Sequence, residues 1–371
     1  MSRAGVFCDY NAGAPPLPEV VATFAEIEAT HPANPSSAHT PGRAARALLE
    51  AARARIAAVL GLPAEDVLFT SGGTESANLA VLGLGDASRP VLMADVEHPA
   101  VAESAAVRGI VRWSVDAHGC AIVVPPAVPV GLLALTHAQG EIGTLQPVGT
   151  AIALAEQLGV PCFVDASQTL GRVALEEPLQ GGAIVALSPH KCGGLRGFGV
   201  LAGRELAARL RPLLRGGGQE LGLRPGTQSP ALAAANALAI ERAILETPKR
   251  AAAMAANRSA FRSGLSASGV LHEVLTPLEH AVPNTLMVRF ESVEGRSLLP
   301  ALDLDGVYAS HGSACSSGAP TPPRVLLAMG LDEATARACV RFSFGWLDAR
   351  GELDVAARRA GARIHARQKK S

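Results

Sequence analysis

The sequence has few charged and few aromatic residues, and neither sign of charge is in excess. Of its 371 residues, 18% are charged and 4% are aromatic, and 33 Lys and Arg balance 33 Asp and Glu. Without net positive charge there is no electrostatic reason to expect nucleic acid or an anionic membrane as the main partner. The composition therefore favours chemistry on a small molecule.

Long hydrophobic runs and clustered cysteines are also missing. The most apolar stretch, residues 120–135, is interrupted by prolines and is shorter than the roughly 20 residues that cross a bilayer. The N-terminal segment has no apolar run of the kind found in signal peptides, so we expect a cytoplasmic protein without a membrane partner. The six cysteines include no CxxC pair, which argues against a metal site and a disulfide framework and favours free thiols.

The length, about two and a half times that of a typical domain of ~150 residues, indicates two domains. Short apolar runs recur between helical segments: VLFT, PVLMAD, GLLALTHA, VPCFVD, AIVALS and GFGVLAG. This alternation is typical of a mostly parallel sheet covered by helices on both faces. We predict an α/β protein with a large domain at residues 15–250 and a smaller α+β domain formed by residues 1–14 and 251–371.

Lysine is scarce, and one lysine stands apart from the others. Lys249, Lys369 and Lys370 lie in polar or terminal segments, whereas Lys191 follows the apolar run AIVALS-Pro-His. Partial desolvation at the end of a strand lowers the pKa of a lysine and makes its amine a nucleophile. An ordinary surface lysine after a strand is the alternative.

Asp165 ends a second apolar run, VPCFVD, and is predicted at the same edge of the sheet as Lys191. It either caps the segment that follows or meets a cation or ligand. A lysine that binds an aldehyde, beside an aspartate that pairs with a ring nitrogen, is the pattern of a pyridoxal phosphate site.

Such a cofactor also needs a phosphate cradle. The string Ser71-Gly72-Gly73-Thr74 lies between a predicted strand and a helix, where backbone N–H groups can bind a dianion, although an ordinary turn is the alternative. His98 precedes Pro99 and is predicted to cap a helix at a strand end, with its ring facing the same crevice.

Three features of the second half of the chain allow two interpretations each. The string GGGQELGLRPGT forms either an anion-binding nest or a flexible loop. Arg341, inside a predicted strand, pairs either with a protein carboxylate or with a substrate carboxylate. Cys315 lies in HGSACSSGAPTPP, a segment of small and polar residues that predicts an exposed thiol. This thiol is either a reactive group or an ordinary surface cysteine.

Together these strings resemble the fold-type I pyridoxal phosphate enzymes of the class V aminotransferase superfamily, and within it cysteine desulfurases of the NifS/IscS type. The resemblance runs almost end to end, in the family's order, through DYNAGAPP, NPSSAHTPGRAAR, FTSGGTESANLA, VEHPAV, GEIGTLQPV, VDASQTLGRV, SPHKCGG, GGGQELGLRPGT, GSACSSG and VRFSFG. It implies pyridoxal 5'-phosphate as the cofactor and conversion of L-cysteine to L-alanine, with the sulfur passing to a protein thiol.

Carried over position by position, the resemblance implies that Lys191 binds the cofactor aldehyde and that Asp165 pairs with the pyridine nitrogen. His98 would stack on the ring and shuttle protons, and Cys315 would take the sulfur as a persulfide. The other cofactor contacts would be polar side chains and one close glycine: Gln168 to the phenolic oxygen, and Gly73, Thr74, Ser188, His190 and Thr227 to the phosphate.

The resemblance also implies substrate contacts and partners. Arg341 and Asn11 would bind the substrate. Thr227 would reach the phosphate of a neighbouring subunit, which implies a homodimer with shared active sites. The sulfur would then pass to a protein acceptor, such as an iron–sulfur cluster scaffold or a thiolation partner.

The chain departs from the family pattern at several positions. Gly140 stands where an asparagine is usual beside the cofactor phenolate and the substrate carboxylate, and the longer side chain of Gln139 could enter that space. Lesser departures are Gly13 and Ala14 in place of two threonines, Pro225 in RPGT, and His311 in place of a threonine.

The departure at Gly140 leaves the identity of the substrate open. Selenocysteine lyase activity would follow the same route as cysteine desulfuration. Another class V lyase or aminotransferase would keep the cofactor site but would need no Cys315. A low-activity paralogue would bind the cofactor and act mainly as a sulfur relay.

Overall fold

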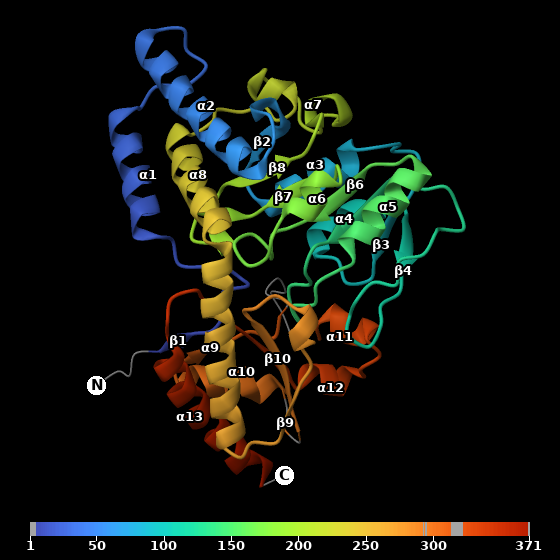
Figure 1. Cartoon of the computed structure of the whole chain (residues 1–371), viewed down its shortest axis with the longest axis vertical. Coiled ribbons are helices and arrows are strands. Elements are labelled where there is room, and N and C mark those ends of the chain that lie inside the picture. The colour runs from blue at the N-terminus through green and yellow to red at the C-terminus, as the bar shows by residue number, and fades with distance from the viewer. Residues whose placement is uncertain (1–4, 292, 294, 313–321, 370–371) are drawn as a thin grey trace.

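The computed structural model describes residues 5–291, 293, 295–312 and 322–369. A large helix-covered sheet lies at one end of the molecule and a smaller sheet at the other, and α9 (Thr247–Ala267) leads from the first to the second (Figure 1). The N-terminal segment belongs with the smaller part, because β1 (Val6–Phe7) pairs with β11 (Val307–Tyr308). The domain boundary expected at residue 250 falls inside α9.

Within the described residues the large sheet has seven strands in the order β2-β8-β7-β6-β5-β3-β4. The pairs from β7 through β6, β5 and β3 to β4 are parallel, and β8 is antiparallel to both of its neighbours. The predicted mostly parallel sheet is therefore confirmed. The strands are β2 (Val67–Thr70), β3 (Val91–Ala94), β4 (Ile110–Trp113), β5 (Leu132–Thr136), β6 (Cys162–Asp165), β7 (Ile184–Leu187) and β8 (Gly199–Ala202).

Helices cover both faces of this sheet, because successive side chains of a strand point to opposite faces. In β6, Val164 packs on one face and Phe163 on the other. The first face is covered by α2 (Thr40–Leu60), α5 (Val148–Leu158), α6 (Glu176–Gln180) and α8 (Pro230–Leu245), and α1 (Pro18–Thr30) packs on α8. The second is covered by α3 (Gly73–Gly83), α4 (Pro99–Ala106) and α7 (Leu206–Arg209).

Local sequence signals explain where α2 begins and ends. The Nδ1 atom of His39 accepts the N–H of Gly42, which satisfies one of the unpaired donors of the first turn. Gly61 follows the last residue with φ of 67°, in the left-handed region that favours glycine at this position. These local contacts therefore fix both ends of α2.

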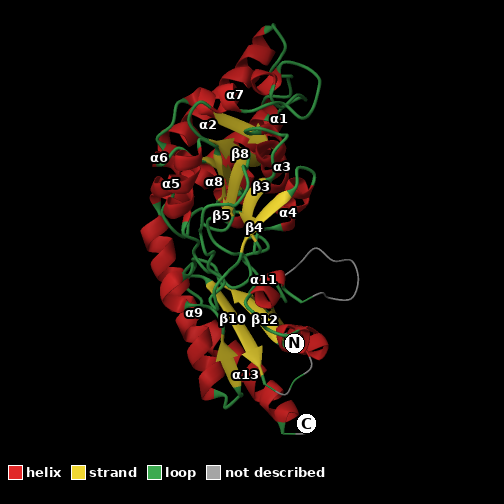
Figure 2. Ribbon diagram, turned by 90° about the vertical axis from the view of Figure 1, so that its right-hand side faces the viewer, coloured by secondary structure: helices red, strands yellow, loops and turns green. Residues whose placement is uncertain are grey.

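The smaller part is built on a three-stranded antiparallel sheet in the order β12-β10-β9, as far as the described residues show. Phe261 of α9 packs against Phe342 of β12 with ring centroids 4.6 Å apart, and α9 runs along one side of this sheet (Figure 2). The remaining elements of this part are β9 (His272–Val274), β10 (Thr285–Phe290), α10 (Gly295–Leu304), α11 (Arg324–Ala328), α12 (Glu333–Arg337), β12 (Cys339–Ser343) and α13 (Arg350–Gln368).

The topology brings several strand ends to one edge of the large sheet. The carboxyl ends of β3, β5, β6 and β7 share an edge because these strands are parallel. Since β2 and β7 are both antiparallel to β8, β2 ends at the same edge. The segments that follow these strands therefore meet, and this edge is where ligands bind in open α/β sheets.

No helix in the described part of the chain is both long and apolar enough to cross a membrane. The same residues contain no group of three or more His, Cys, Asp or Glu side chains placed to hold a metal ion.

Candidate active site

Gly73, at the start of α3, lies against two serine hydroxyls. Ser188 follows β7 and Ser167 follows β6, both are buried, and their Oγ atoms are 2.9 Å apart. A Cβ at position 73 would overlap Ser188 Oγ and would lie 3.0 Å from Ser167 Oγ. The glycine therefore lets a helix N-terminus approach the two hydroxyls, which makes a cradle suited to a phosphate group. Thr74 is exposed beside it.

Lys191, Asp165 and His98 come from three strand ends at this edge. Lys191 closes the 3-10 turn η2 (Pro189–Lys191) after β7, Asp165 is the last residue of β6, and His98 caps α4 after β3. The N–H of Ser167 donates to Asp165 Oδ1 at 2.9 Å and fixes that carboxylate. Partial desolvation lowers the pKa of His98, Asp165 raises it and Lys191 lowers it. The three groups thus lie within electrostatic reach of one another.

The ring of His98 is held in one tautomer. Its Nδ1 accepts the N–H of Ala100 at 3.1 Å, so the neutral ring carries its proton on Nε2. Because its pKa is lowered below the ordinary 6.5, the ring is neutral at pH 7. In the protein without substrate, Nε2 is therefore a hydrogen-bond donor.

Glu97, the residue before His98, is a buried carboxyl group at the same edge. Its Oε1 accepts the N–H of Thr136 at 2.9 Å, and its Oε2 has no partner among the described residues. Burial raises the pKa of Glu97 well above its usual value, the Thr136 hydrogen bond lowers it, and the negative charge of Asp165 raises it. The raised pKa favours the neutral form of Glu97 beside the negative charge of Asp165.

Arg172 ties Gln168 to the N-terminal segment. It is 2% exposed and donates from Nη1 to Gln168 Oε1 at 2.6 Å and to Asn11 Oδ1 at 2.8 Å, and from Nη2 to the Tyr10 carbonyl at 3.1 Å. Gln168 Nε2 donates to the Asn11 carbonyl at 3.1 Å. A glutamine amide has two N–H groups, so one is left for another acceptor.

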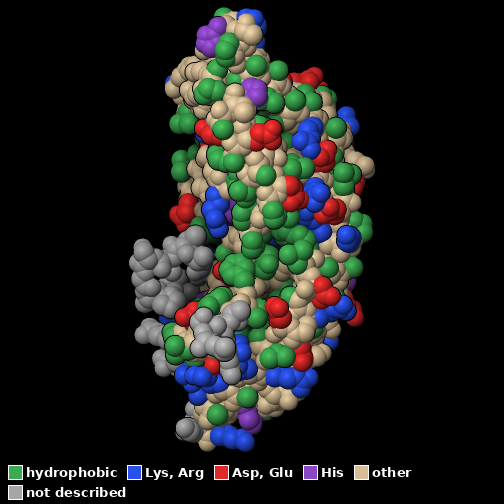
Figure 3. Space-filling view, turned by 90° about the vertical axis from the view of Figure 1, so that its left-hand side faces the viewer, with side chains coloured by type: hydrophobic (Ala, Val, Ile, Leu, Met, Phe, Trp, Pro, Cys, Tyr) green, Lys and Arg blue, Asp and Glu red, His purple; other side chains and the backbone are tan. Residues whose placement is uncertain are grey.

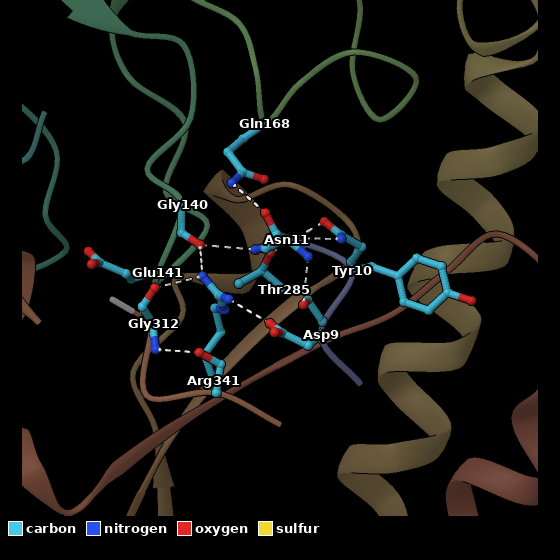
Figure 4. Close-up of polar contacts among 12 residues, drawn as sticks. Asp9, Tyr10, Asn11, Gly140, Glu141, Gln168, Thr285, Gly312 and Arg341 are labelled. Carbon is cyan, nitrogen blue, oxygen red and sulfur yellow. Dashed lines mark hydrogen bonds and ion pairs between the residues drawn. The ribbon is translucent and has the colours of Figure 1, made fainter. Parts of the chain in front are cut away.

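Every hydrogen-bonding position of the Asn11 side chain is used by the protein, and Figure 4 shows its contacts with Gly140 and Thr285. Its Nδ2 donates to the Gly140 carbonyl at 3.0 Å and to Thr285 Oγ1 at 2.8 Å. Its Oδ1 accepts from Arg172 and from Asn284, the latter at 2.9 Å. A primary amide offers two donors and two acceptor positions, so the predicted contact with substrate would have to replace one of these bonds.

Arg341 reaches this edge from β12 of the small sheet and is 3% exposed. Its Nη2 donates to Asp9 Oδ1 at 2.6 Å, and its Nη1 donates to the carbonyls of Gly140 at 3.0 Å and Gly312 at 3.2 Å (Figure 4). Pairing with a protein carboxylate, one of the two interpretations of Arg341, is therefore confirmed. Its Nε is buried and has no partner in the described part of the chain, so the N–H on Nε remains for a further acceptor.

The hypothesis that Gln139 fills the space beside Gly140 is wrong. Gln139 Oε1 accepts the N–H groups of Glu141 and Ile142, and its Nε2 donates to the Glu141 carboxylate, so the side chain closes its own turn. The neighbour of Gly140 is Gln168, because a Cβ at position 140 would lie 3.1 Å from Gln168 Nε2.

Two predicted phosphate contacts have different surroundings. His190 follows Ser188, and desolvation together with the charges of Lys191 and Arg196 lowers the pKa of its ring to about 4. Thr227 is exposed after the 3-10 turn η3 (Gln219–Gly222), and in the described chain its side chain has no hydrogen bond to the residues above. The structure therefore gathers all the predicted cofactor residues except Thr227 at one edge.

The loop before Thr227 is held by a buried ion pair. The carboxylate of Glu220 accepts from Arg53 Nη1 at 2.8 Å and Nη2 at 2.6 Å, and also from the N–H of Phe69 at 2.8 Å. Glu220 and Leu221 both have positive φ, at 49° and 57°, and Leu221 is 67% exposed. The ion pair thus holds a strained loop that presents apolar surface outward.

The described cysteines are poor candidates for a reactive thiol. Burial raises the pKa of each of them, to about 12 for Cys162, Cys192 and Cys339, and also upward for Cys8 and Cys120. A raised pKa disfavours the thiolate, which is the nucleophilic form. Cys315 lies outside the residues that the structure describes.

Sequence reasoning missed four residues of this site: Asp9, Glu97, Ser167 and Arg172. Ser167 and Arg172 stand in the string VDASQTLGRV around the predicted Asp165 and Gln168. A serine two residues after a strand-ending aspartate was a usable signal, because it can bind that carboxylate through its N–H. Nothing in the sequence showed that Asp9 meets Arg341, which lies in a distant strand.

Replacing Gly73 with alanine is expected to weaken cofactor binding by about tenfold or more. The added Cβ would overlap Ser188 Oγ, so the helix N-terminus would have to move away from the serine pair. Titration of the apoprotein with pyridoxal phosphate, followed by visible absorption, measures the Kd. Gly351→Ala is the matched control, because nothing lies within 4 Å of a Cβ there. Equal Kd values for the two variants would contradict the cradle.

The buried His137 predicts a loss of stability at acid pH. His137 is 7% exposed, its Nδ1 lies 3.1 Å from Thr169 Oγ1, and burial lowers its pKa to about 4. The unfolded chain takes up this proton near pH 6.5, so the unfolded state binds more protons between pH 6.5 and 4. The contribution of His137 to the free energy of unfolding is therefore present above this window and lost as the pH falls through it, by on the order of 3 kcal/mol.

Urea unfolding at roughly pH 7.5 and roughly pH 4 tests this expectation. The His137→Gln variant, which cannot titrate at this position, should lose less stability between the two pH values than the parent. The same loss in both proteins would show that His137 does not set the acid sensitivity.

Comparisons with known proteins agree on one family. A family model described as aminotransferase class-V matches residues 6–355. An IscS-like cysteine desulfurase of Mycobacterium tuberculosis is 33% identical, over 94% of this chain and 94% of its own length. The cysteine desulfurase NifS of Azotobacter vinelandii is 33% identical, over 95% of this chain and 90% of its own. The solved structure of a NifS-like protein superposes with a TM-score of 0.86 at 30% identity, covering 96% of this chain and 98% of that one.

Proposed function

The chain belongs to the aminotransferase class-V family and is a pyridoxal-phosphate-dependent cysteine desulfurase, and we propose that it moves sulfur from L-cysteine to Cys315 and releases L-alanine. One observation carries the proposal: Arg341 meets the carboxyl edge of the large sheet at Gly140. A carboxylate-binding side chain thereby reaches the same sheet edge that Lys191 follows. Through Gly312, the same arginine also holds the start of the segment that contains Cys315.

The residues at the sheet edge fit pyridoxal phosphate. Gly73 and Ser188 form a cradle that a Cβ would fill, and Lys191 and Asp165 supply an amine for the aldehyde and a carboxylate for the ring nitrogen. Gln168 keeps one N–H for the phenolic oxygen. When bound, the cofactor supplies an electron sink for the negative charge that develops on the substrate. The further contacts that we propose are Thr74 and His190 to the phosphate and His98 against the ring.

Substrate binding is assigned to Arg341. Its Nε has no partner in the described chain, so it can donate to a substrate carboxylate while Asp9 and Gly140 keep the guanidinium in place. Asn11 acts indirectly in this arrangement, because it fixes the Gly140 carbonyl that Arg341 binds. The substrate carboxylate is thereby oriented by a rigid group.

Proton transfer is assigned to His98. Its Nδ1 is occupied by the Ala100 N–H, so the neutral ring donates a hydrogen bond to the substrate from Nε2, and it takes up a proton at Nδ1 only when the contact with Ala100 opens. The lowered pKa of the ring keeps it neutral, which avoids a second positive charge beside Lys191.

Sulfur transfer requires a thiolate that can reach the substrate. In our proposal the Cys315 thiolate attacks the substrate sulfur, a sulfur–sulfur bond forms, and the substrate carbon–sulfur bond breaks. The electron pair of the broken bond stays with the carbon, which takes up a proton. L-Cysteine and the Cys315 thiol thus become L-alanine and a Cys315 persulfide, and no outside oxidant is needed.

Product analysis tests this function. The purified protein, loaded with pyridoxal phosphate and given L-cysteine and dithiothreitol, should release alanine and sulfide in equal amounts. Pyruvate and ammonia would instead indicate a lyase, and a keto acid that retains the sulfur would indicate an aminotransferase. A large preference for L-selenocysteine in the same assay would favour a selenocysteine lyase.

We also propose that the protein is a homodimer with shared sites. Hydrophobic side chains gather midway along the face that carries α1 (Figure 3). Exposed hydrophobic residues of the segments near this face include Val21 in α1, Phe7 in β1 and Leu347 after β12. Such a surface is stabilised when a second copy covers it. The exposed Thr227, which no hydrogen bond ties to its own site, would then reach the phosphate of the second copy.

Mixed dimers test the sharing of sites. Lys191→Ala and Thr227→Ala subunits, unfolded together and refolded, should regain activity, because one of the two sites in each mixed dimer has both native residues. If Thr227 instead contributes to the site of its own subunit, every site in the mixed dimer lacks either Lys191 or Thr227. The mixture then stays as inactive as each variant alone. Sedimentation analysis of the same samples establishes whether a dimer is present.

The sulfur acceptor that we propose is a thiol of another protein, such as an iron–sulfur cluster scaffold or a thiolation partner. Protein charged with isotope-labelled cysteine and freed of substrate should pass its label to an acceptor that carries free cysteines. Label that stays on the desulfurase with every such acceptor would contradict the proposal.

A further inference from the structure

Arg172 is a buried cation whose hydrogen-bond partners are all neutral. Its guanidinium is 2% exposed, and its acceptors are the Gln168 and Asn11 side chains and the Tyr10 carbonyl. In the described part of the chain, no Asp or Glu forms an ion pair with it. Burying a charge without a counter-ion destabilises the folded protein, so we looked for a function that Arg172 serves.

The contacts of Arg172 fix the orientation of the Gln168 amide. Because Nη1 donates to Gln168 Oε1 at 2.6 Å, the amide cannot turn over without placing its own N–H groups against the guanidinium. Nε2 therefore points away from Arg172, where one N–H binds the Asn11 carbonyl at 3.1 Å and the other is left for a ligand.

Gly140 makes room for this amide. A Cβ at position 140 would lie 3.1 Å from Gln168 Nε2 and 3.6 Å from its Cδ, closer than ordinary van der Waals contact in the first case. A larger side chain would press on the group that Arg172 orients. Gly140, Gln168 and Arg172 thus form one arrangement in which the glutamine amide takes the space that a side chain at position 140 would need.

We propose that Arg172 is a positioning residue that orients the Gln168 amide and strengthens its remaining N–H as a donor to the phenolic oxygen of the cofactor. This role rests on the contact proposed above for Gln168. A guanidinium that donates to an amide oxygen polarises the amide and makes its N–H a stronger donor. In a site without a side chain at position 140, Arg172 thus stabilises the phenolic oxygen through the Gln168 amide.

The bound cofactor itself reports on this effect, because its visible absorption changes when it takes up a proton. A stronger hydrogen-bond donor to the phenolic oxygen stabilises its negative charge and disfavours protonation. Arg172→Met should therefore raise the pH midpoint of the absorption change by about one unit. Arg172→Lys keeps the charge but loses the planar set of donors, and should stay closer to the parent.

The Gln168→Ala background separates two ways in which Arg172 could act. If Arg172 acts through Gln168, Arg172→Met should produce little further shift once the amide is gone. An equal shift in both backgrounds would overturn the proposal, because the charge would then act directly through space. No shift with either Arg172 variant in the parent background would also overturn it, while a shift with Gln168→Ala alone would leave the proposed cofactor contact intact.

Arg108 provides the matched control. Like Arg172 it donates to backbone carbonyls, those of Val81 and Leu84 among them, but it lies before β4 at the opposite edge of the sheet. Arg108→Met should lower the thermal unfolding temperature without moving the midpoint. If Arg172→Met does not fold, Arg172→Gln replaces it in both backgrounds. A raised midpoint in the parent background that is absent in the Gln168→Ala background supports the proposal, and an unchanged midpoint or an equal rise in both backgrounds overturns it.

Discussion

Replacing Lys191 with alanine is expected to remove the covalently held cofactor and to lower kcat/KM for L-cysteine on the order of 10³-fold or more. Lys191 follows β7 at the edge where Asp165 and His98 lie, and it is the lysine there that can bind an aldehyde. Treating the parent with borohydride should fix the cofactor to the peptide that contains Lys191, and the variant should lose the cofactor on denaturation.

Lys249→Ala is the matched control, since Lys249 is exposed in α9. It should keep both the cofactor and the activity. A Lys191→Ala protein that still holds borohydride-reducible cofactor would contradict the assignment of Lys191 as the residue that binds the cofactor aldehyde.

Replacing Cys315 with serine is expected to stop catalytic sulfide release, again by on the order of 10³-fold or more, while the cofactor spectrum is retained. The hydroxyl cannot form a persulfide, but it leaves the residues at the sheet edge untouched. Cys120→Ser is the control, because Cys120 is a free and partly exposed cysteine whose pKa is raised by burial. Sulfide release by Cys315→Ser at the rate of the parent would show that another group takes the sulfur.

The large sheet was predictable because its strands are short runs of apolar residues. Ile184–Leu187 is buried along its whole length, so every residue of this strand is apolar. An uninterrupted apolar run of this kind is easily distinguished from a polar loop. The smaller part of the molecule was harder to predict. Its apolar segment at residues 307–309 forms a strand only at Val307 and Tyr308, in a separate two-stranded sheet with the short β1.

The parts of the candidate site that were predictable are residues marked by their own position in the sequence. Lys191 and Asp165 each end an apolar run, and parallel strands bring such ends together without further information. Arg341 allowed two interpretations because its partner Asp9 comes from the other end of the chain. Long-range pairs of this kind depend on the packing of the two sheets, which the sequence pattern does not specify.

The space beside Gly140 shows the same limit in another way. The sequence showed a missing side chain and a longer neighbour in Gln139, but it could not show that Gln139 closes its own turn. Gln168 occupies the space because Arg172 holds its amide there. The compensation thus comes from a segment that follows a different strand.

A single turnover without reductant tests the central claim most directly. The cofactor-loaded protein receives L-cysteine labelled with a sulfur isotope, is quenched, and is digested for mass spectrometry while the supernatant is assayed for alanine. One L-alanine should be released per active site, and one labelled sulfur atom should be found on the peptide that contains Cys315. Labelled sulfur on Cys192, beside Lys191, or alanine released without any sulfur on Cys315, would contradict the account.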